Sequence, residues 1–241
     1  KLAMGLATFA AVFAANSADA QHAGDIGLRV VNEQLEVYGP LGEPEDTDGV
    51  YLGVFGDTGF PGYTSNPGFD ALPGTLPSGR IGFTYLDGLK RWDPIEAVWL
   101  DAEQVGESLR VSFITVETII EDDPIVGFSL AVQPDGGWHR HVNFELQPDQ
   151  DDVRIPGVYR IDLSLYNDME LAESEPFTIL FDYEAAPEEV SAAIDSMYED
   201  DSCPADYDGN GTVDGGDLSV LLGAWASSDP DVDLSGNDFI D

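Results

Sequence analysis

Basic residues are scarce in this chain. Only 9 of the 241 residues are Lys or Arg, against 47 Asp or Glu, which gives a formal net charge of −38. Binding to nucleic acid or to anionic lipid requires a basic surface. The composition therefore argues against both partners. Cations are the natural partners of such a surface, because a cation relieves the repulsion between clustered carboxylates.

Cysteine and histidine are also rare, with one Cys and three His. A single Cys excludes a dense disulfide scaffold and a Cys-rich metal knuckle within this sequence. The sequence also contains no phosphate-binding loop, no G-x-S-x-G elbow and no H-E-x-x-H pair. A hydrophobic fraction of 43% is sufficient for a core. From 241 residues we expect one medium domain with a smaller module, or two modest domains.

A long hydrophobic run occurs only at the amino terminus. One lysine precedes an apolar run over Leu2–Ala15, and Ala18 and Ala20 then give the small-x-small pattern of a cleavage site. The run is too short to span a bilayer. We predict a signal peptide over residues 1–20, export, and a mature chain that begins at Gln21. Because the sequence starts with Lys instead of Met, we also expect it to be a fragment at this end.

Residues 21–183 show the pattern of β structure. Nine short segments with period-two or continuous apolar character alternate with Gly, Pro, Asn and Asp, and no long helix lies between them. This pattern predicts a mainly β fold, an antiparallel sandwich or jelly roll. The predicted strands are Ile26–Tyr38, Val50–Phe55, Ile81–Leu86, Ala97–Leu100, Leu109–Ile120, Gly127–Val132, Trp138–Leu146, Gly157–Tyr166 and Pro176–Tyr183.

Two other segments complete the predicted body. The stretch Gly56–Gly79 is so rich in Gly and Pro that we expect an ordered loop, which its apolar side chains could fix to the domain. Residues 184–202 are expected to hold one helix and an acidic linker. Pro187 with two glutamates fits a first helical turn, and apolar residues follow at helical spacing. The loop residues are Phe60, Tyr63, Phe69 and Leu72, and the helix residues are Val190, Ala193, Ile194 and Met197.

A calcium loop is the strongest motif. Residues 206–217 read DYDGNGTVDGGD, with oxygen-bearing side chains at positions 1, 3, 5, 9 and 12 and Gly211 at position 6. This is EF-hand spacing, in which the chain wraps a hard cation and the glycine allows a sharp turn. An apolar helix is expected to follow over Leu218–Trp225. The predicted ligands are Asp206, Asp208, Asn210, Asp214 and Asp217, with the backbone carbonyl of Thr212.

The run CPADYDGNGTVDGGDLSVLLGAW, residues 203–225, resembles the first half of a bacterial dockerin. This resemblance implies a small helical calcium module over 203–241 that binds a cohesin-like or cell-surface partner. A second loop has Asp238 at position 6 in place of Gly, and the sequence stops before position 12, so we expect truncation here. For residues 206–217 the alternative is an Asp- and Gly-rich acidic loop that binds no ion. The ligands of the incomplete second loop would be Asp233, Ser235, Asn237 and Asp241.

The histidines suggest a second kind of metal site. In an extended Trp138–Leu146 segment, His139 and His141 lie on one polar face, about 7 Å apart along the strand. Two imidazoles on one rigid strand are suitable ligands for Zn²⁺. The third, His22, is the second residue of the expected mature chain. The alternative is that all three histidines are solvated surface residues.

Four short runs extend this interpretation: HAGDIG from His22, NPGFDA from Asn66, HRHVNF from His139 and PGVY from Pro156. Together they resemble a family of bacterial secreted and surface-anchored proteins of unassigned activity, some of them controlled by zinc-responsive regulators. The resemblance implies zinc binding and adds Asp25 to the candidate ligands. Two residues separate His22 from Asp25 where the family usually has one, which weakens Asp25 more than His22.

These observations predict an exported, non-catalytic protein. The β domain is expected to bind a transition metal, with zinc as the preferred ion. The tail is expected to bind Ca²⁺ and to attach the protein to a cohesin-like or cell-surface partner. One alternative is a carbohydrate-active enzyme or carbohydrate-binding module for polysaccharide degradation, because dockerins often accompany such domains. Another is a structural surface protein whose histidines are incidental.

Overall fold

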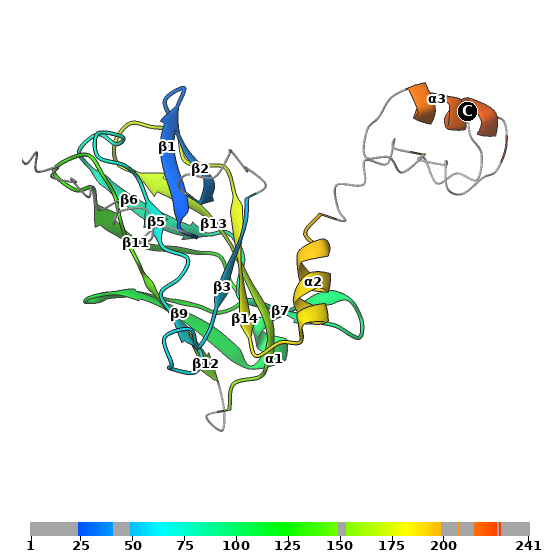
Figure 1. Ribbon diagram of the computed structural model, residues 1–241, viewed down its shortest axis with the longest axis horizontal. Helices are drawn as coiled ribbons and strands as arrows, with labels where there is room; N and C mark the ends of the chain where they lie inside the picture. The colour runs from blue at the N-terminus through cyan, green and yellow to red at the C-terminus, as the bar shows by residue number, and fades with distance from the viewer. Residues whose placement is uncertain are drawn as a thin grey trace, which may run out of the picture.

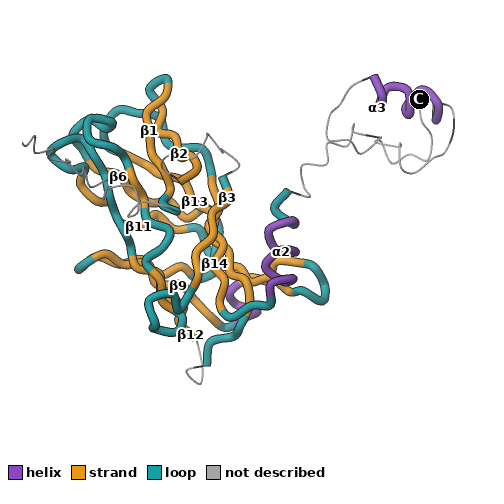
Figure 2. Tube along the Cα trace, viewed as in Figure 1, coloured by secondary structure: helices purple, strands orange, loops and turns teal. Residues whose placement is uncertain are grey.

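The computed structural model describes residues 24–40, 49–148, 153–198, 207, 215–225 and 227. The predicted signal peptide, His22 and most of the predicted calcium loops lie outside these residues. Among the described residues the fold is mainly β, as the sequence predicted, with fourteen strands and three helices (Figures 1 and 2). No helix in this part of the chain has the length and apolar character needed to cross a membrane.

The strands form three hydrogen-bonded sheets. One sheet has the order β2-β1-β5 and another β10-β9-β12-β4. The largest has the order β11-β6-β13-β14-β3, and in it β7 also pairs with β13 and β8 pairs with β7. Most pairs are antiparallel, as predicted, but β1 pairs with β5 and β3 pairs with β14 in parallel. The strands of the first two sheets are β1 (Ile26–Val31), β2 (Gln34–Pro40), β5 (Phe69–Asp70), β10 (Val116–Ile120), β9 (Glu107–Phe113), β12 (Asn143–Pro148) and β4 (Tyr63–Thr64).

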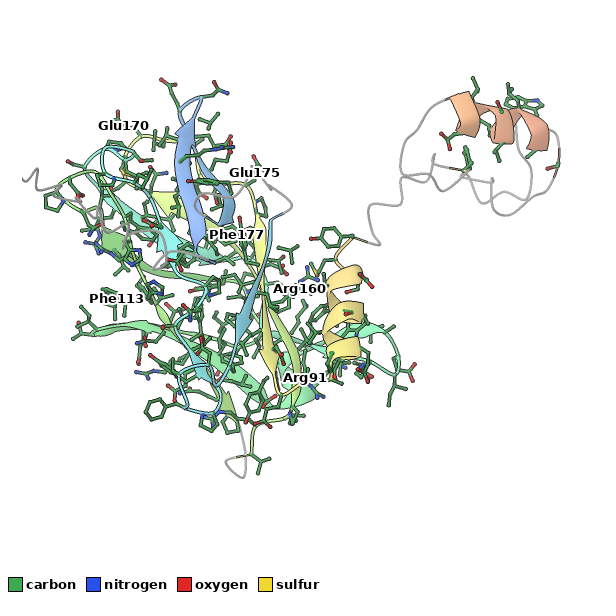
Figure 3. The ribbon with its side chains drawn as sticks, in the orientation of Figure 1. Arg91, Phe113, Arg160, Glu170, Glu175 and Phe177 are labelled. Atoms are coloured by element: carbon green, nitrogen blue, oxygen red, sulfur yellow. The ribbon has the colours of Figure 1, made fainter. Side chains whose placement is uncertain are left out.

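All three sheets contribute side chains to one buried core. Phe69 contacts Phe83, Trp138 and Phe177, with ring centroids 5.3–6.4 Å apart. Phe177, labelled in Figure 3, belongs to the largest sheet, so the short strand β5 is fixed to that sheet through aromatic packing. The largest sheet comprises β11 (Ile125–Ala131), β6 (Arg80–Tyr85), β13 (Gly157–Asn167), β14 (Phe177–Tyr183), β3 (Val50–Val54), β7 (Lys90–Asp93) and β8 (Val98–Asp101).

The predicted helix after the β domain is present as α2 (Pro187–Asp195), with Pro at its start and acidic residues in its first turn. Its Ala193 is buried with Trp92, Val158 and Leu180, so α2 covers the outer face of the largest sheet beside β7 and β14 (Figure 1). Arg160 lies at this junction (Figure 3) with its guanidinium 5.5 Å from the ring centroid of Trp99. The other helices are α1 (Ala102–Val105) and α3 (Gly215–Ala224).

Two predicted strands are in fact hairpins. The segment Ile26–Tyr38 turns at Asn32 and Glu33, whose φ angles are 51° and 64°, and Leu109–Ile120 turns at Ile114, with φ 54°. Positive φ normally favours glycine, and a β-branched residue such as isoleucine rarely adopts it. Ile114 therefore carries no turn signal, whereas Asn32 is of a residue type that adopts positive φ more readily.

The predicted loop Gly56–Gly79 contains β4 and β5, and its apolar residues differ in burial. Phe69 is buried in the core, but Phe60 is 69% exposed and Leu72 is also exposed, so the expectation is confirmed for Phe69 and was wrong for Phe60 and Leu72. The buried carboxylate of Glu107 holds the segment that leads into β13. It accepts hydrogen bonds from the hydroxyl of Tyr159 and from the backbone N–H of Ile155 at 2.9 Å.

Candidate metal centre

His139 and His141 lie on either side of Arg140, which forms an antiparallel bridge with Phe69. The N–H of Phe69 donates to the carbonyl of Arg140 at 2.8 Å, and the N–H of Arg140 donates back at 2.9 Å. The predicted strand Trp138–Leu146 is therefore shorter than expected, because regular pairing as β12 begins only at Asn143. The predicted alternation still holds around the bridge, since the neighbouring apolar side chains Trp138, Val142, Phe144 and Leu146 are buried.

Asp25 lies immediately before β1, and hydrogen bonds with the chain at Gly68 bring it beside the two histidines. Its Oδ1 accepts the N–H of Gly68 at 3.0 Å, and the N–H of Ile26 donates to the carbonyl of Gly68 at 2.8 Å. Segments that are far apart in the sequence thus meet through backbone hydrogen bonds. The geometry of the carboxylate is set by the backbone around it.

The donor atoms of Asp25, His139 and His141 all lie within 4.8 Å of one another. Asp25 Oδ2 is 3.4 Å from His141 Nε2 and 3.9 Å from His139 Nδ1. Zinc in a tetrahedral site with bonds of about 2.0–2.1 Å has neighbouring ligands about 3.3–3.4 Å apart. These separations are therefore at or slightly above those of a zinc shell, and the three residues could hold a metal ion.

The orientation of His141 is set by a hydrogen bond on the far side of its ring. Nδ1 lies 2.9 Å from the backbone carbonyl of Ser65, which is a hydrogen-bond acceptor only. A proton on Nδ1 therefore leaves the lone pair of Nε2 directed at Asp25. Such bonds from ligand histidines to carbonyl groups are usual in metal sites, where they fix the tautomer and the ring. At His139, the backbone N–H donates to Gln133 Oε1 at 3.1 Å.

The charges within the site perturb each other. Burial alone would raise the pKa of Asp25, but the hydrogen bond and the charge of His141, with the N–H of Gly68, lower it below its usual value. The hydrogen bond to Asp25 in turn raises the pKa of His141. The carboxylate of Asp25 therefore favours a positive charge beside it. A cation that binds here competes with protons for the imidazole nitrogens.

Gly68 is packed closely against two of the donors. A Cβ atom at this position would lie 2.6 Å from His141 Cε1 and 2.8 Å from Asp25 Oδ1. Both distances are shorter than real Cβ contacts, and the backbone here does not have positive φ. The glycine is thus needed for space. The sequence contained the residue within its Asn66–Ala71 motif but held no indication of this contact.

The structure describes only some of the predicted site residues. It brings together Asp25, His139 and His141, although spacing had weakened Asp25 as a ligand. His22 lies outside the described residues, as do Asp206, Asp208, Asn210, Thr212, Asp214 and the whole incomplete loop. Asp217 is described and lies buried, 2% exposed, in the first turn of α3. One nearby carboxylate that was not predicted, Asp70, lies 3.8 Å from His139 Nδ1 through its Oδ2.

No known protein family and no curated protein matches the chain. Among solved structures, a family 123 glycoside hydrolase from Clostridium perfringens, studied for glycolipid glycan hydrolysis, is similar with a TM-score of 0.27 and 12% identity. The match covers 58% of this chain and 24% of that enzyme, so the chain corresponds to about a quarter of the enzyme's length. A likeness this slight carries no argument about fold or activity.

Proposed function

We propose that this is an exported, non-catalytic protein whose β domain binds a transition-metal ion, with zinc as the best fit. One observation carries the proposal: the carboxylate of Asp25 and the imidazoles of His139 and His141 converge within 4.8 Å. The two imidazoles come from the motif that suggested zinc in the sequence. The carboxylate comes from a distant segment that backbone hydrogen bonds bring to them.

The donor set favours a borderline cation. Zn²⁺ takes imidazole nitrogen and carboxylate oxygen readily, whereas Ca²⁺ and Mg²⁺ take oxygen ligands in larger number. Copper and nickel also accept imidazole, so a direct comparison of metals is part of the test. His22 is a further candidate ligand from the sequence. It precedes Asp25 by three residues, a chain length that spans at most about 11 Å.

The test is metal content and affinity of the full chain. Protein that is stripped with chelator and then supplied with zinc should retain close to one equivalent after gel filtration. His141→Gln should reduce that content, because it removes the nitrogen that faces Asp25. Asp123→Asn, an exposed substitution outside the site, is the control. Retention of less than about a tenth of an equivalent by the unaltered protein would overturn the proposal.

A second proposal concerns the tail, which we propose binds Ca²⁺ and attaches the protein to a cohesin-like or cell-surface partner. It is supported by α3, which begins near the end of the predicted loop and has the carboxylate of Asp217 buried in its first turn. Exposed apolar side chains on α3 and just beyond it would suit a protein partner. They are Leu218, Leu222 and Trp225.

Calcium titration of the full chain tests this second proposal. Asp206→Ala should remove calorimetrically detected binding to the first loop, because it deletes the carboxylate at position 1. The zinc affinity of the same variant should be unchanged. Its zinc binding therefore also reports whether its β domain is folded. Equal calcium binding by the variant and the unaltered chain would contradict the calcium loop. Release of reducing sugar from a polysaccharide panel by the unaltered chain would overturn the non-catalytic part of the proposal.

A further inference from the structure

Backbone pairing places a second carboxylate at the metal centre. Phe69 and Arg140 are bridged in antiparallel fashion, so Asp70 stands across from His139, and Gly68 stands across from His141. Side chains alternate between the two faces of extended chain. Since Phe69 is buried in the core, its neighbour Asp70 is directed to the opposite face, where the histidines lie. The register therefore places each histidine opposite a neighbour of Phe69.

The distances agree with this register. Asp70 Oδ2 lies 3.8 Å from His139 Nδ1, and Asp25 Oδ2 lies 3.9 Å from the same nitrogen. Two carboxylates thus approach one imidazole nitrogen from similar distances. Both separations exceed the ligand spacing of a tetrahedral zinc site by only about 0.5 Å, a change that small side-chain rotations can supply. We propose that Asp70 is a further ligand of the metal held by Asp25, His139 and His141, an inference that rests on the proposed zinc function.

The carboxylates and the imidazoles of the site differ in burial. The side chains of Asp25 and Asp70 are 5% and 7% exposed, whereas those of His139 and His141 are 35% and 31% exposed. The carboxylates therefore form the inner side and the imidazoles the outer side. An ion enters past the histidines and is held at the carboxylates.

The charge count favours a divalent ion. Two carboxylates with two neutral imidazoles carry a charge of −2, which a divalent cation neutralises. Charge is costly to bury unless it is paired, so neutrality matters for side chains as enclosed as these. Removing the charge of Asp70 would leave the bound site with a net positive charge. The carboxylate is therefore expected to contribute to affinity as well as to geometry.

A purely orienting role for Asp70 would look different. A residue that only orients a ligand histidine binds the ring nitrogen that faces away from the metal, as the Ser65 carbonyl does for His141. Asp70 instead approaches Nδ1 of His139, the nitrogen that also faces Asp25. It therefore lies on the metal side of the ring.

Asp70→Asn tests the inference, because it preserves shape and removes the charge. Zinc affinity is measured by competition with a chromophoric chelator, and Co²⁺ is used as a spectroscopic probe of coordination. The variant should bind zinc at least about 10–100-fold more weakly, the loss usual even for residues that only support a ligand. Its Co²⁺ absorption should change in position and intensity. Asp123→Asn should match the unaltered protein in both measurements.

The outcomes separate this inference from the proposed function. If the unaltered chain binds zinc and Asp70→Asn binds it equally well with the same Co²⁺ spectrum, Asp70 is not a ligand although the zinc function stands. If the unaltered chain binds no zinc, both fail. A crystal structure of the zinc-loaded unaltered protein decides the point without a variant. A carboxylate oxygen of Asp70 should lie about 2.0–2.2 Å from zinc, and a distance beyond about 3 Å would refute the inference.

Discussion

Replacing Gly68 with alanine adds one methyl group where two metal donors converge. The new Cβ would lie 2.6 Å from His141 Cε1 and 2.8 Å from Asp25 Oδ1, whereas carbon atoms in contact are about 3.5–4.0 Å apart. The histidine ring must therefore move by close to an ångström. Metal–ligand distances are expected to hold within about 0.2 Å, so the displacement is several times the tolerance of a metal site.

We expect Gly68→Ala to weaken zinc binding by at least about 10–100-fold, comparable with the loss of a residue that supports a ligand. The metal-free protein should lose only about 1–3 kcal/mol of unfolding free energy, the usual cost of overpacking. Chelator competition measures the affinity, and urea unfolding with and without zinc measures the stability. The increase in unfolding free energy that zinc produces should fall far more than the unfolding free energy of the metal-free protein.

Gly223→Ala is the matched control, because it adds the same methyl group on α3. Among the described residues, no atom outside the backbone of that helix lies within 4 Å of the added carbon. The control should leave zinc affinity unchanged. The reasoning is refuted if Gly68→Ala folds and binds zinc with the affinity of the unaltered protein. That result would mean that His141 and Asp25 can move apart without loss, or that they are not ligands.

The remaining predictions concern protonation and a buried hydrogen bond. Zinc affinity should fall as pH decreases, by about tenfold per pH unit for each imidazole that becomes protonated, because protons compete with the metal. Since the hydrogen bond to Asp25 raises the pKa of His141, the decline should begin above the usual histidine pKa, and a pH-independent affinity between about pH 5 and pH 8 would contradict it. Tyr159→Phe should lower the free energy of unfolding by about 1–3 kcal/mol, because Glu107 loses a donor inside the protein. Urea unfolding measures this loss, Tyr198→Phe at an exposed side chain is the control, and equal stability of the two variants would show that the buried bond contributes little.

Local patterns in the sequence predicted those features that depend on neighbouring residues. Period-two apolar segments indicated the β domain, and a proline followed by two glutamates indicated α2. The alternation around His139 and His141 placed both imidazoles on the polar side, because side-chain direction in extended chain follows from position alone. It did not show that this segment pairs with the chain that carries Phe69, through hydrogen bonds of Arg140 with Phe69 and of Trp138 with Ala71.

Tertiary structure decided the rest. The hairpin turn at Ile114 has a backbone conformation that its sequence disfavours, and the parallel pairing of β1 with β5 joins strands that no local pattern connects. The approach of Asp70 to His139 and the space left by Gly68 arise from the same long-range pairing. The sequence by itself determined which residue types were available to bind a cation. Only the register between distant segments decided which of them meet, since that register depends on the burial of the whole core and on hydrogen bonds across it.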